Sequence, residues 1–380
     1  MKQRFIILTM LLIIISGIVN ADDSDELLVK NLIEEGKYDE LEIYMNSKMS
    51  THNVNALDDI LKKALIHMER NSEYKLRLKY INIFLNKYPD FPDKDYYYKQ
   101  YGITSKMIYR YKDAASFLEK YISVAIDNFH FYLWEQLSEI YFTLGDYNKC
   151  LFFLEQTLKT ESNLTSFTVP ANIQLVEVYF AQGKMNKALD LINNKITKYK
   201  QNDDFKVYYL KFKIELAKYY MINEDWDEFN KVDNLPLFWN NHRTNYMYKL
   251  QRISKYRDSI IIDVYKSYSL CKYSKTIDKI ESINQNKLSY KEKLLLATMK
   301  GVSEFWEGER ERAKEYLKRA INKRNDLLDE ASFYLALIYF DEGNYVQAQK
   351  SLDEFNKVGR KSDLYFEGKR LQARLDNRLK

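Results

Sequence analysis

Residues 131–164 read FYLWEQLSEIYFTLGDYNKCLFFLEQTLKTESNL. Up to Tyr141 the apolar residues recur every three or four positions, which is the spacing of one face of an α-helix. Gly145 and Asp146 interrupt this pattern, and a second stripe of the same period starts at Tyr147. The stretch therefore predicts two antiparallel helices joined by a short turn.

The spacing within this hairpin resembles the tetratricopeptide repeat. Counted from Phe131, position 4 is bulky, position 7 is Leu, position 11 is Tyr, position 15 is Gly, position 17 is Tyr, position 20 is small and position 24 is apolar. The same template fits nine successive units, whose period in the mid-thirties is typical of stacked helical hairpins. The nine units start at Asp22, Asp58, Asp95, Phe131, Val169, Leu210, Arg257, Leu294 and Asp329.

The glycines support this register independently. Two of the ten, Gly102 and Gly301, fall at position 8, where two helices approach closely and a side chain would obstruct them. Five others fall at position 15, in the turn between the two helices, where glycine readily adopts a positive φ. These five are Gly36, Gly145, Gly183, Gly308 and Gly343.

Residues 203–290 match the template poorly, and 234–252 fit no unit. This segment contains Pro236, Phe238, Trp239, His242 and Tyr246. One interpretation is a protruding ligand loop, and the favoured one is a lengthened, proline-kinked helix whose aromatic residues pack on its neighbours. The chain is accordingly divided into an array at 22–202, an irregular helical segment or divergent repeat at 203–256, a second array at 257–362 and a capping helix at 363–380.

Residues 1–21 have the pattern of an export signal. Lys2 and Arg4 precede an apolar core that ends at Val19, and Ala21 is a small residue suited to cleavage. We expect cleavage after Ala21, with an uncleaved N-terminal anchor as the alternative. The signal predicts export to the bacterial cell envelope, as a periplasmic, envelope-associated or secreted protein.

Charge and chemistry give no sign of an enzyme or of a nucleic-acid-binding protein. The formal net charge is +5, and removal of the two leader cations leaves 5 − 2 = +3, which offers no electrostatic footprint for nucleic acid. The four histidines lack zinc-ligand spacing, and Cys150 and Cys271 lie three units apart, which we expect to be too far for a disulfide even where the superhelix curves. No catalytic residue, cofactor or metal site is predicted.

The resemblance implies a binding groove. In tetratricopeptide proteins the first helix of each unit lines the concave face, through positions 2, 5, 9 and 12. An aromatic residue at position 12 can instead pack between units, and both interpretations stay open. The residues that the resemblance places in a protein-binding groove are Lys99, Glu135, Glu139, Phe142, Ile173, Glu177, Phe180, Thr298, Val302, Phe305, Phe333 and Phe340.

The sequence thus predicts an all-α, right-handed α-solenoid of about nine tetratricopeptide-like hairpins plus a C-terminal capping helix. We expect a non-enzymatic scaffold of the bacterial envelope that binds protein or peptide partners in its groove, with no nucleic acid and no membrane insertion after signal cleavage. Three alternatives remain: a secreted effector or adhesin-like factor, a structural subunit of an envelope complex, and an enzyme with a cleft in residues 203–256.

Overall fold

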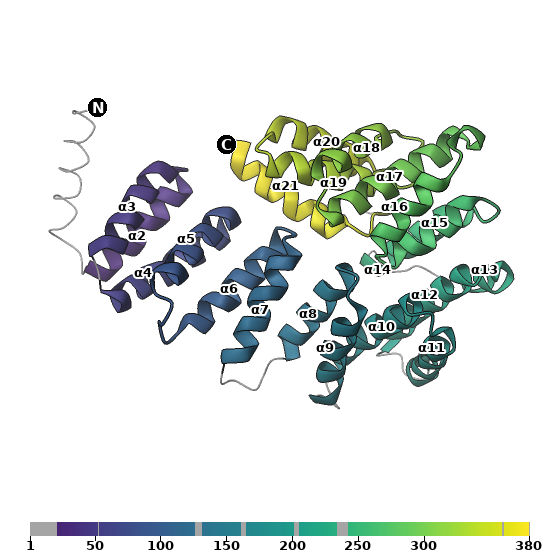
Figure 1. The fold of residues 1–380 in the computed structure, drawn as a ribbon, viewed down its shortest axis with the longest axis horizontal. Coiled ribbons are helices and arrows are strands. Elements are labelled where there is room, and N and C mark those ends of the chain that lie inside the picture. Colours follow the sequence, from purple (N-terminus) through teal and green to yellow (C-terminus); the bar gives the residue numbers. More distant parts are fainter. Residues whose placement is uncertain are drawn as a thin grey trace. The chain divides into compact units, whose positions relative to one another are not determined.

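The computed structural model describes residues 21–51, 53–125, 131–160, 165–200, 205–233, 242–358 and 361–379. The chain forms two compact units, Met1–Asn128 and Phe129–Lys380. Within the described ranges the secondary structure consists of twenty α-helices and one short 3₁₀-helix (Figure 1). The predicted export signal lies outside these ranges up to Asn20, so its processing stays a prediction.

The first unit consists of three consecutive hairpins. Its helices are α2 (Ala21–Glu34), α3 (Tyr38–Thr51), α4 (Val54–Arg70), α5 (Tyr74–Lys87), α6 (Lys94–Met107) and α7 (Tyr111–Val124).

The second unit continues the series with six more hairpins, one inserted helix and a final helix. Its helices are α8 (Phe131–Thr143), α9 (Tyr147–Thr160), α10 (Thr165–Ala181), α11 (Met185–Lys200), α12 (Lys206–Ile222), α13 (Trp226–Asp233), α14 (His242–Ser254), α15 (Ile260–Ser269), α16 (Tyr273–Ser282), α17 (Tyr290–Glu307), α18 (Arg310–Ala320), α19 (Leu328–Asp341), α20 (Tyr345–Val358) and α21 (Tyr365–Leu379).

The predicted register is confirmed in all nine hairpin repeats of the sequence analysis. The second helix of each repeat begins at the residue assigned to position 17. The residue at position 15 has a positive φ in every turn. Five turns use glycine there, and four place an L-residue in this strained region, which costs about 1 kcal/mol each. Those four residues are Ser72, Tyr109, Glu224 and Cys271.

Position 8 is the close approach that the sequence predicts. A Cβ atom on Gly102 would lie 2.6 Å from Leu118 Cγ, and one on Gly301 would lie 2.7 Å from Leu317 Cγ. Both leucines occupy position 24 of the same hairpin. The missing side chain at position 8 therefore lets the second helix pack its leucine directly on the first helix.

The hairpins of the second unit curve back on themselves. The Tyr147 hydroxyl donates a hydrogen bond of 2.5 Å to the backbone oxygen of Leu270, joining the α8–α9 turn to the α15–α16 turn. Cys150 and Cys271 are both free thiols. Their hairpins nevertheless lie closer together than the sequence predicts, because curvature of the array, which we expected to have little effect, brings hairpins three units apart into contact.

The irregular segment contains a hairpin and an extra helix. Helices α12 and α13 form a hairpin whose second helix is only 8 residues long. The extra helix α14 carries Tyr246, whereas Pro236, Phe238 and Trp239 lie outside the described residues. The domain boundaries at 202, 256 and 362 stay predictions.

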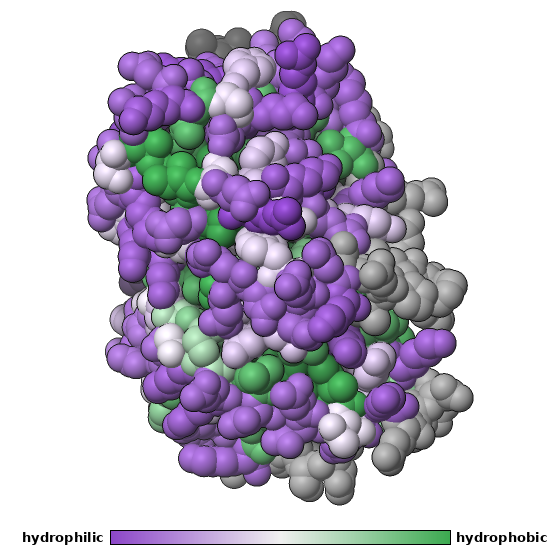
Figure 2. Space-filling view, turned by 90° about the vertical axis from the view of Figure 1, so that its right-hand side faces the viewer, coloured by the Kyte–Doolittle hydropathy of each residue, from purple (hydrophilic) through white to green (hydrophobic). Residues whose placement is uncertain are grey.

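The final helix α21 packs against α19 and α20. Leu371 and Leu375 are buried, and a Cβ on Gly368 would collide with the Phe355 ring at 2.2 Å. The face drawn in Figure 2 is mainly hydrophilic, with hydrophobic residues in separate groups. Within the described residues, none of the helices combines the length and hydrophobicity required to span a membrane.

Candidate protein-binding sites

The first helices of the first unit present exposed apolar side chains. Leu27 on α2 is 54% exposed and Ile66 on α4 is 43% exposed. Glu26, next to Leu27, lies 3.4 Å from both Lys63 Nζ and His67 Nε2, the residues that flank Ile66 on α4. These contacts join α2 to α4 at the level where the two aliphatic side chains are exposed.

Two lysines at position 5 lie on the same series of helices. Lys62 Nζ pairs with Asp58 at 2.7 Å and lies 5.2 Å from the centroid of the Tyr96 ring. Lys99 Nζ lies 5.4 Å from the centroid of the Tyr121 ring, and no carboxylate pairs with it in the described parts of the chain. We call the surface formed by Leu27, Lys62, Ile66 and Lys99 the open face.

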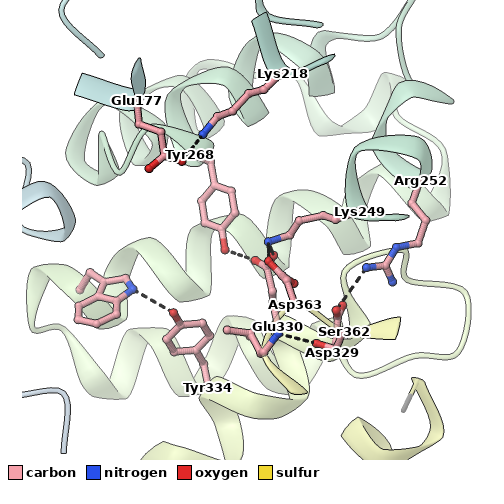
Figure 3. Close-up of polar contacts among 12 residues, drawn as sticks. Glu177, Lys218, Lys249, Arg252, Tyr268, Asp329, Glu330, Tyr334, Ser362 and Asp363 are labelled. Carbon is pink, nitrogen blue, oxygen red and sulfur yellow. Dashed lines mark hydrogen bonds and ion pairs between the residues drawn. The ribbon is translucent and has the colours of Figure 1, made fainter. Parts of the chain in front are cut away.

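In the second unit, helix α14 covers the corresponding surface. Its Lys249 pairs with Glu330 on α19 and, at 2.7 Å, with Asp363 Oδ2 (Figure 3). Its Arg252 Nη2 lies 3.3 Å from Asp329 Oδ2, also on α19. Helix α14 thus places two cations, three residues apart, against a group of three carboxylates.

Burial makes this group electrostatically distinct. Asp329, Glu330 and Asp363 are all buried. Because three carboxylates face only the two cations Lys249 and Arg252, one carboxylate has no cation of its own. Burial raises the pKa of Glu330, and the neighbouring carboxylates of Asp363 and Asp329 add to this effect against the opposing charge of Lys249. The extra carboxylate therefore holds a proton more readily than an exposed glutamate does.

Lys249 responds in the opposite sense. Burial alone lowers the pKa of a lysine, but the carboxylates of Asp363 and Glu330 outweigh burial and hold the Lys249 pKa well above its usual range. The Tyr268 hydroxyl donates a hydrogen bond to Glu330 Oε2. Lys249 therefore stays charged at the centre of the group.

A second ion pair, of a buried lysine with a partly exposed glutamate, also lies next to α14. Lys218 Nζ on α12 is 3.0 Å from Glu177 Oε1 on α10, and both residues occupy position 9 of their units. The same ammonium group lies 5.5 Å from the centroid of the Tyr246 ring on α14. First helices that precede α14 and first helices that follow it therefore both contact this inserted helix.

A pocket of about 150 Å³ lies between α14 and the first helices α15, α17 and α19. Tyrosine is its main lining residue, and Lys249 and Glu330 are its charged groups. In the ranges that the structure describes, no group of three or more His, Cys, Asp or Glu is arranged to hold a metal ion. The tyrosines that line the pocket are Tyr246, Tyr265, Tyr268, Tyr273 and Tyr334.

Most of the predicted groove residues are packed inside the array. Phe142 contacts the Tyr147 ring at 5.8 Å between centroids, and Phe340 contacts the Tyr345 ring at 5.5 Å, so position 12 packs on position 17 of the same hairpin. The eight buried residues are Phe142, Ile173, Phe180, Thr298, Val302, Phe305, Phe333 and Phe340.

The polar members of the predicted groove are more accessible. Lys99, Glu135 and Glu177 are partly exposed and Glu139 is exposed. Glu177 and Val302 are brought to the surroundings of α14, the first through Lys218 and the second as part of the pocket lining. Binding of a partner by any of these residues stays a prediction.

Sequence reasoning missed the charged group around α14. The pattern Tyr246-x-x-Lys249-x-x-Arg252 places three side chains along one side of a helix, and this spacing was the available signal. Their partners lie 77 and 114 residues away in the sequence. A repeat template does not assign residues in an insertion, so it gives no reason to connect them.

No protein-family model and no curated protein matches the sequence. Among solved structures, a tetratricopeptide repeat protein from Parabacteroides merdae aligns with 73% of this chain and 97% of its own, at 15% identity and a TM-score of 0.39. Naa15/Naa10 bound to HypK-THB aligns with 92% of this chain and 60% of its own, at 13% identity and a TM-score of 0.35.

The APC/C hetero-tetramer Cut9–Hcn1 aligns with 92% of this chain and 64% of its own, at 12% identity and a TM-score of 0.31. Likeness at these scores is too low to support a functional argument. The tetratricopeptide-like fold therefore rests on the consecutive hairpins and their register described above.

Proposed function

We propose that the protein is a non-catalytic scaffold of the bacterial cell envelope, which binds protein segments on the first helices of its hairpins. One observation carries this proposal: the first helices of the second unit already hold a helix, α14, which belongs to the same chain. Met247, Leu250 and Ile253 on that helix are fully buried. A surface that binds an internal helix has the chemistry needed to bind a helix or strand from another protein.

The open face of the first unit is the surface proposed for a partner. Leu27 and Ile66 offer apolar contact, and Lys99 offers a cation that no carboxylate neutralises in the described residues. A segment that suits this face carries apolar side chains and a carboxylate. A flexible segment of a partner protein that carries these residue types could bind to the open face, and binding of this kind needs no catalytic group.

The envelope location is supported by the sequence of residues 1–21, with its basic start, apolar core and small residue at the expected cleavage site. Cell fractionation tests it, together with N-terminal sequencing of the purified protein. We expect a mature chain that begins at Asp22 in the envelope fraction. An uncleaved cytoplasmic chain would contradict this part of the proposal.

Two matched isoleucines test the binding surface. Ile66 lies on the first helix α4, and Ile43, 58% exposed, lies on the second helix α3 of the same unit. A partner captured from envelope extract and then purified provides the ligand for affinity measurements. We expect Ile66→Asp to weaken binding at least about tenfold, because a charge then enters an apolar contact, and Ile43→Asp to change it less than about twofold.

Circular dichroism of both variants confirms that the first unit remains folded. Equal affinity of the two variants for the partner would show that the open face is not the binding surface. Stronger loss in Ile43→Asp than in Ile66→Asp would assign binding to the second helices.

A further inference from the structure

Helix α14 sits in the second unit as a ligand would sit in a binding site. One side carries Met247, Leu250 and Ile253, which are fully buried. Another side carries Lys249 and Arg252, which pair with carboxylates of other elements. An apolar stripe beside a pair of cations gives a helix a single register on an acidic surface.

The fit of α14 to this surface is incomplete. Arg252 makes one contact of 3.3 Å with Asp329 Oδ2, whereas a guanidinium group can bind a carboxylate through two parallel hydrogen bonds. Arg252 Nε and Asp329 Oδ1 are both buried and have no hydrogen-bond partner among the described residues. Since Asp329 is fully buried, its unused oxygen lowers the stability of the present arrangement.

We propose that the first helices α15, α17 and α19, together with Asp363, form a second binding site, for a basic helix of a partner protein that displaces α14. The partner helix carries a lysine or arginine at two positions three residues apart, beside an apolar stripe. Its cations take the places of Lys249 and Arg252 against Glu330, Asp363 and Asp329. An arginine that binds both oxygens of Asp329 satisfies the atom that α14 leaves unpaired.

Displacement is compatible with the energetics of the site. When one helix replaces another, the carboxylates stay paired and the apolar surface of the first helices stays covered, so the main cost of displacement is exposure of the Met247, Leu250 and Ile253 side chains of α14. Buried ion pairs contribute little net stability compared with apolar residues of the same size, but a mismatched charge is strongly unfavourable. The three carboxylates therefore select which helix binds, and the affinity of α14 for its own site sets how tightly a competitor must bind.

The test uses a synthetic peptide of residues 242–254, the sequence of α14, labelled with a fluorophore. In the parent chain the site is occupied, so the peptide binds weakly. Ile253→Ala loosens α14 without removing a charge, and we expect it to raise the peptide's affinity at least about tenfold, because the site is vacant more often. A peptide with Lys249→Glu and Arg252→Glu should not bind either protein detectably.

Leu250→Ala serves as a second loosened variant if Ile253→Ala unfolds the second unit. Hydrogen exchange on the parent chain needs no variant: an excess of peptide, marked by Ile253→Val so that its fragments differ in mass, should speed exchange of the α14 amides. The charge-reversed peptide should leave that exchange unchanged.

Three results would overturn the proposal. They are absence of peptide binding to a folded loosened variant, equal binding of the charge-reversed peptide, and a concentration-dependent dimer of the loosened variant, which would assign the site to α14 of a second copy. The proposal extends the proposed function to the second unit and rests on it only in treating first helices as protein-binding surfaces. Because the peptide comes from this chain, its failure would leave the open face of the first unit untouched.

Discussion

The two units are built from the same hairpins but differ in what their first helices contact. In the first unit, Leu27 and Ile66 on neighbouring first helices are exposed. In the second unit, an inserted helix covers this surface, and residues such as Val302 are buried beside it. One additional helix therefore converts an exposed face of a repeat array into a core.

The charged contacts of the two units differ in the same way. Glu26 and its partner Lys63 are 42% and 37% exposed, and exposed ion pairs contribute about 0–1 kcal/mol. Lys249 and its partners Glu330 and Asp363 are at most 10% exposed. Loss of one member of such a buried group leaves uncompensated charge, so its cost is larger. The comparison predicts that equivalent substitutions have unequal effects in the two units.

The largest effect is expected for Lys249→Met. This change leaves three buried carboxylates facing Arg252 alone, and breaking a buried ion pair costs about 3–5 kcal/mol. Denaturation in urea measures the free energy of unfolding. All four tryptophans, which are Trp134, Trp226, Trp239 and Trp306, lie in the second unit, so their fluorescence reports on that unit.

Lys99→Met in the first unit is the matched control. Lys99 is partly exposed and contacts the Tyr121 ring, so its loss should lower the free energy of unfolding by less than about 1 kcal/mol. Circular dichroism during urea denaturation measures this change. Losses of the same size in the two variants would show that burial of the charged group does not separate the units.

The next effect is expected at position 8, where the two units are alike. Alanine at Gly102 or Gly301 would place a Cβ about as close to a leucine of the second helix in either unit. Overpacking of this kind costs about 1–3 kcal/mol. We expect both variants to lose stability by circular dichroism, but only Gly301→Ala to shift the transition seen by tryptophan fluorescence. A fluorescence shift in Gly102→Ala would show that the units do not unfold separately.

The sequence predicts the hairpins well because the information is local. The helical period, the turn at position 15 and the close approach at position 8 all lie within one hairpin of about 35 residues. The register holds even at Ser72, Tyr109, Glu224 and Cys271, where no glycine marks the turn. The template therefore located these turns from their neighbours rather than from their own residue type.

The binding surface is harder to predict because it depends on residues that are distant in the sequence. Phe142 suits both a groove and a core, and only the position of Tyr147 decides between them. In the sequence Lys249 is an ordinary cation of a helix, and only the structure shows that Asp363, 114 residues away, is its partner. A repeat template describes what the hairpins share, whereas this site depends on α14, a helix inserted between two hairpins.

A smaller effect is expected in the pH dependence of the two carboxylates Glu330 and Glu26. Burial raises the pKa of Glu330 in the folded chain, so its stabilising proton is fully bound below the unfolded pKa of about 4.5 and is lost as pH rises through the folded value. Since glutamine does not titrate, the stability of Glu330→Gln relative to the parent should increase as pH rises from about 4.5 through the raised pKa of the folded Glu330.

Glu26→Gln should behave in the opposite sense. The hydrogen bond from His67, followed by Lys63, lowers the pKa of Glu26, so the parent gains stability relative to this variant as pH rises through the folded and then the unfolded pKa. Fluorescence follows the first variant and circular dichroism the second. The same pH trend in both would mean that Glu330 is not held in a buried, carboxylate-rich group.

The smallest effects are expected at position 15, where both units use the same left-handed turn. Ser72 has a φ of 60° and Gly183 a φ of 71°. Ser72→Gly relieves strain and should stabilise the first unit, whereas Gly183→Ala introduces strain and should destabilise the second, each by about 1 kcal/mol. Apart from its two chain neighbours, no atom of the described residues lies within 4 Å of a Cβ on Gly183, so the alanine acts through backbone conformation alone. Shifts of the urea midpoint in opposite directions would show that the two units share their turn chemistry, even though their first helices contact different surroundings. A destabilised Ser72→Gly variant would contradict this.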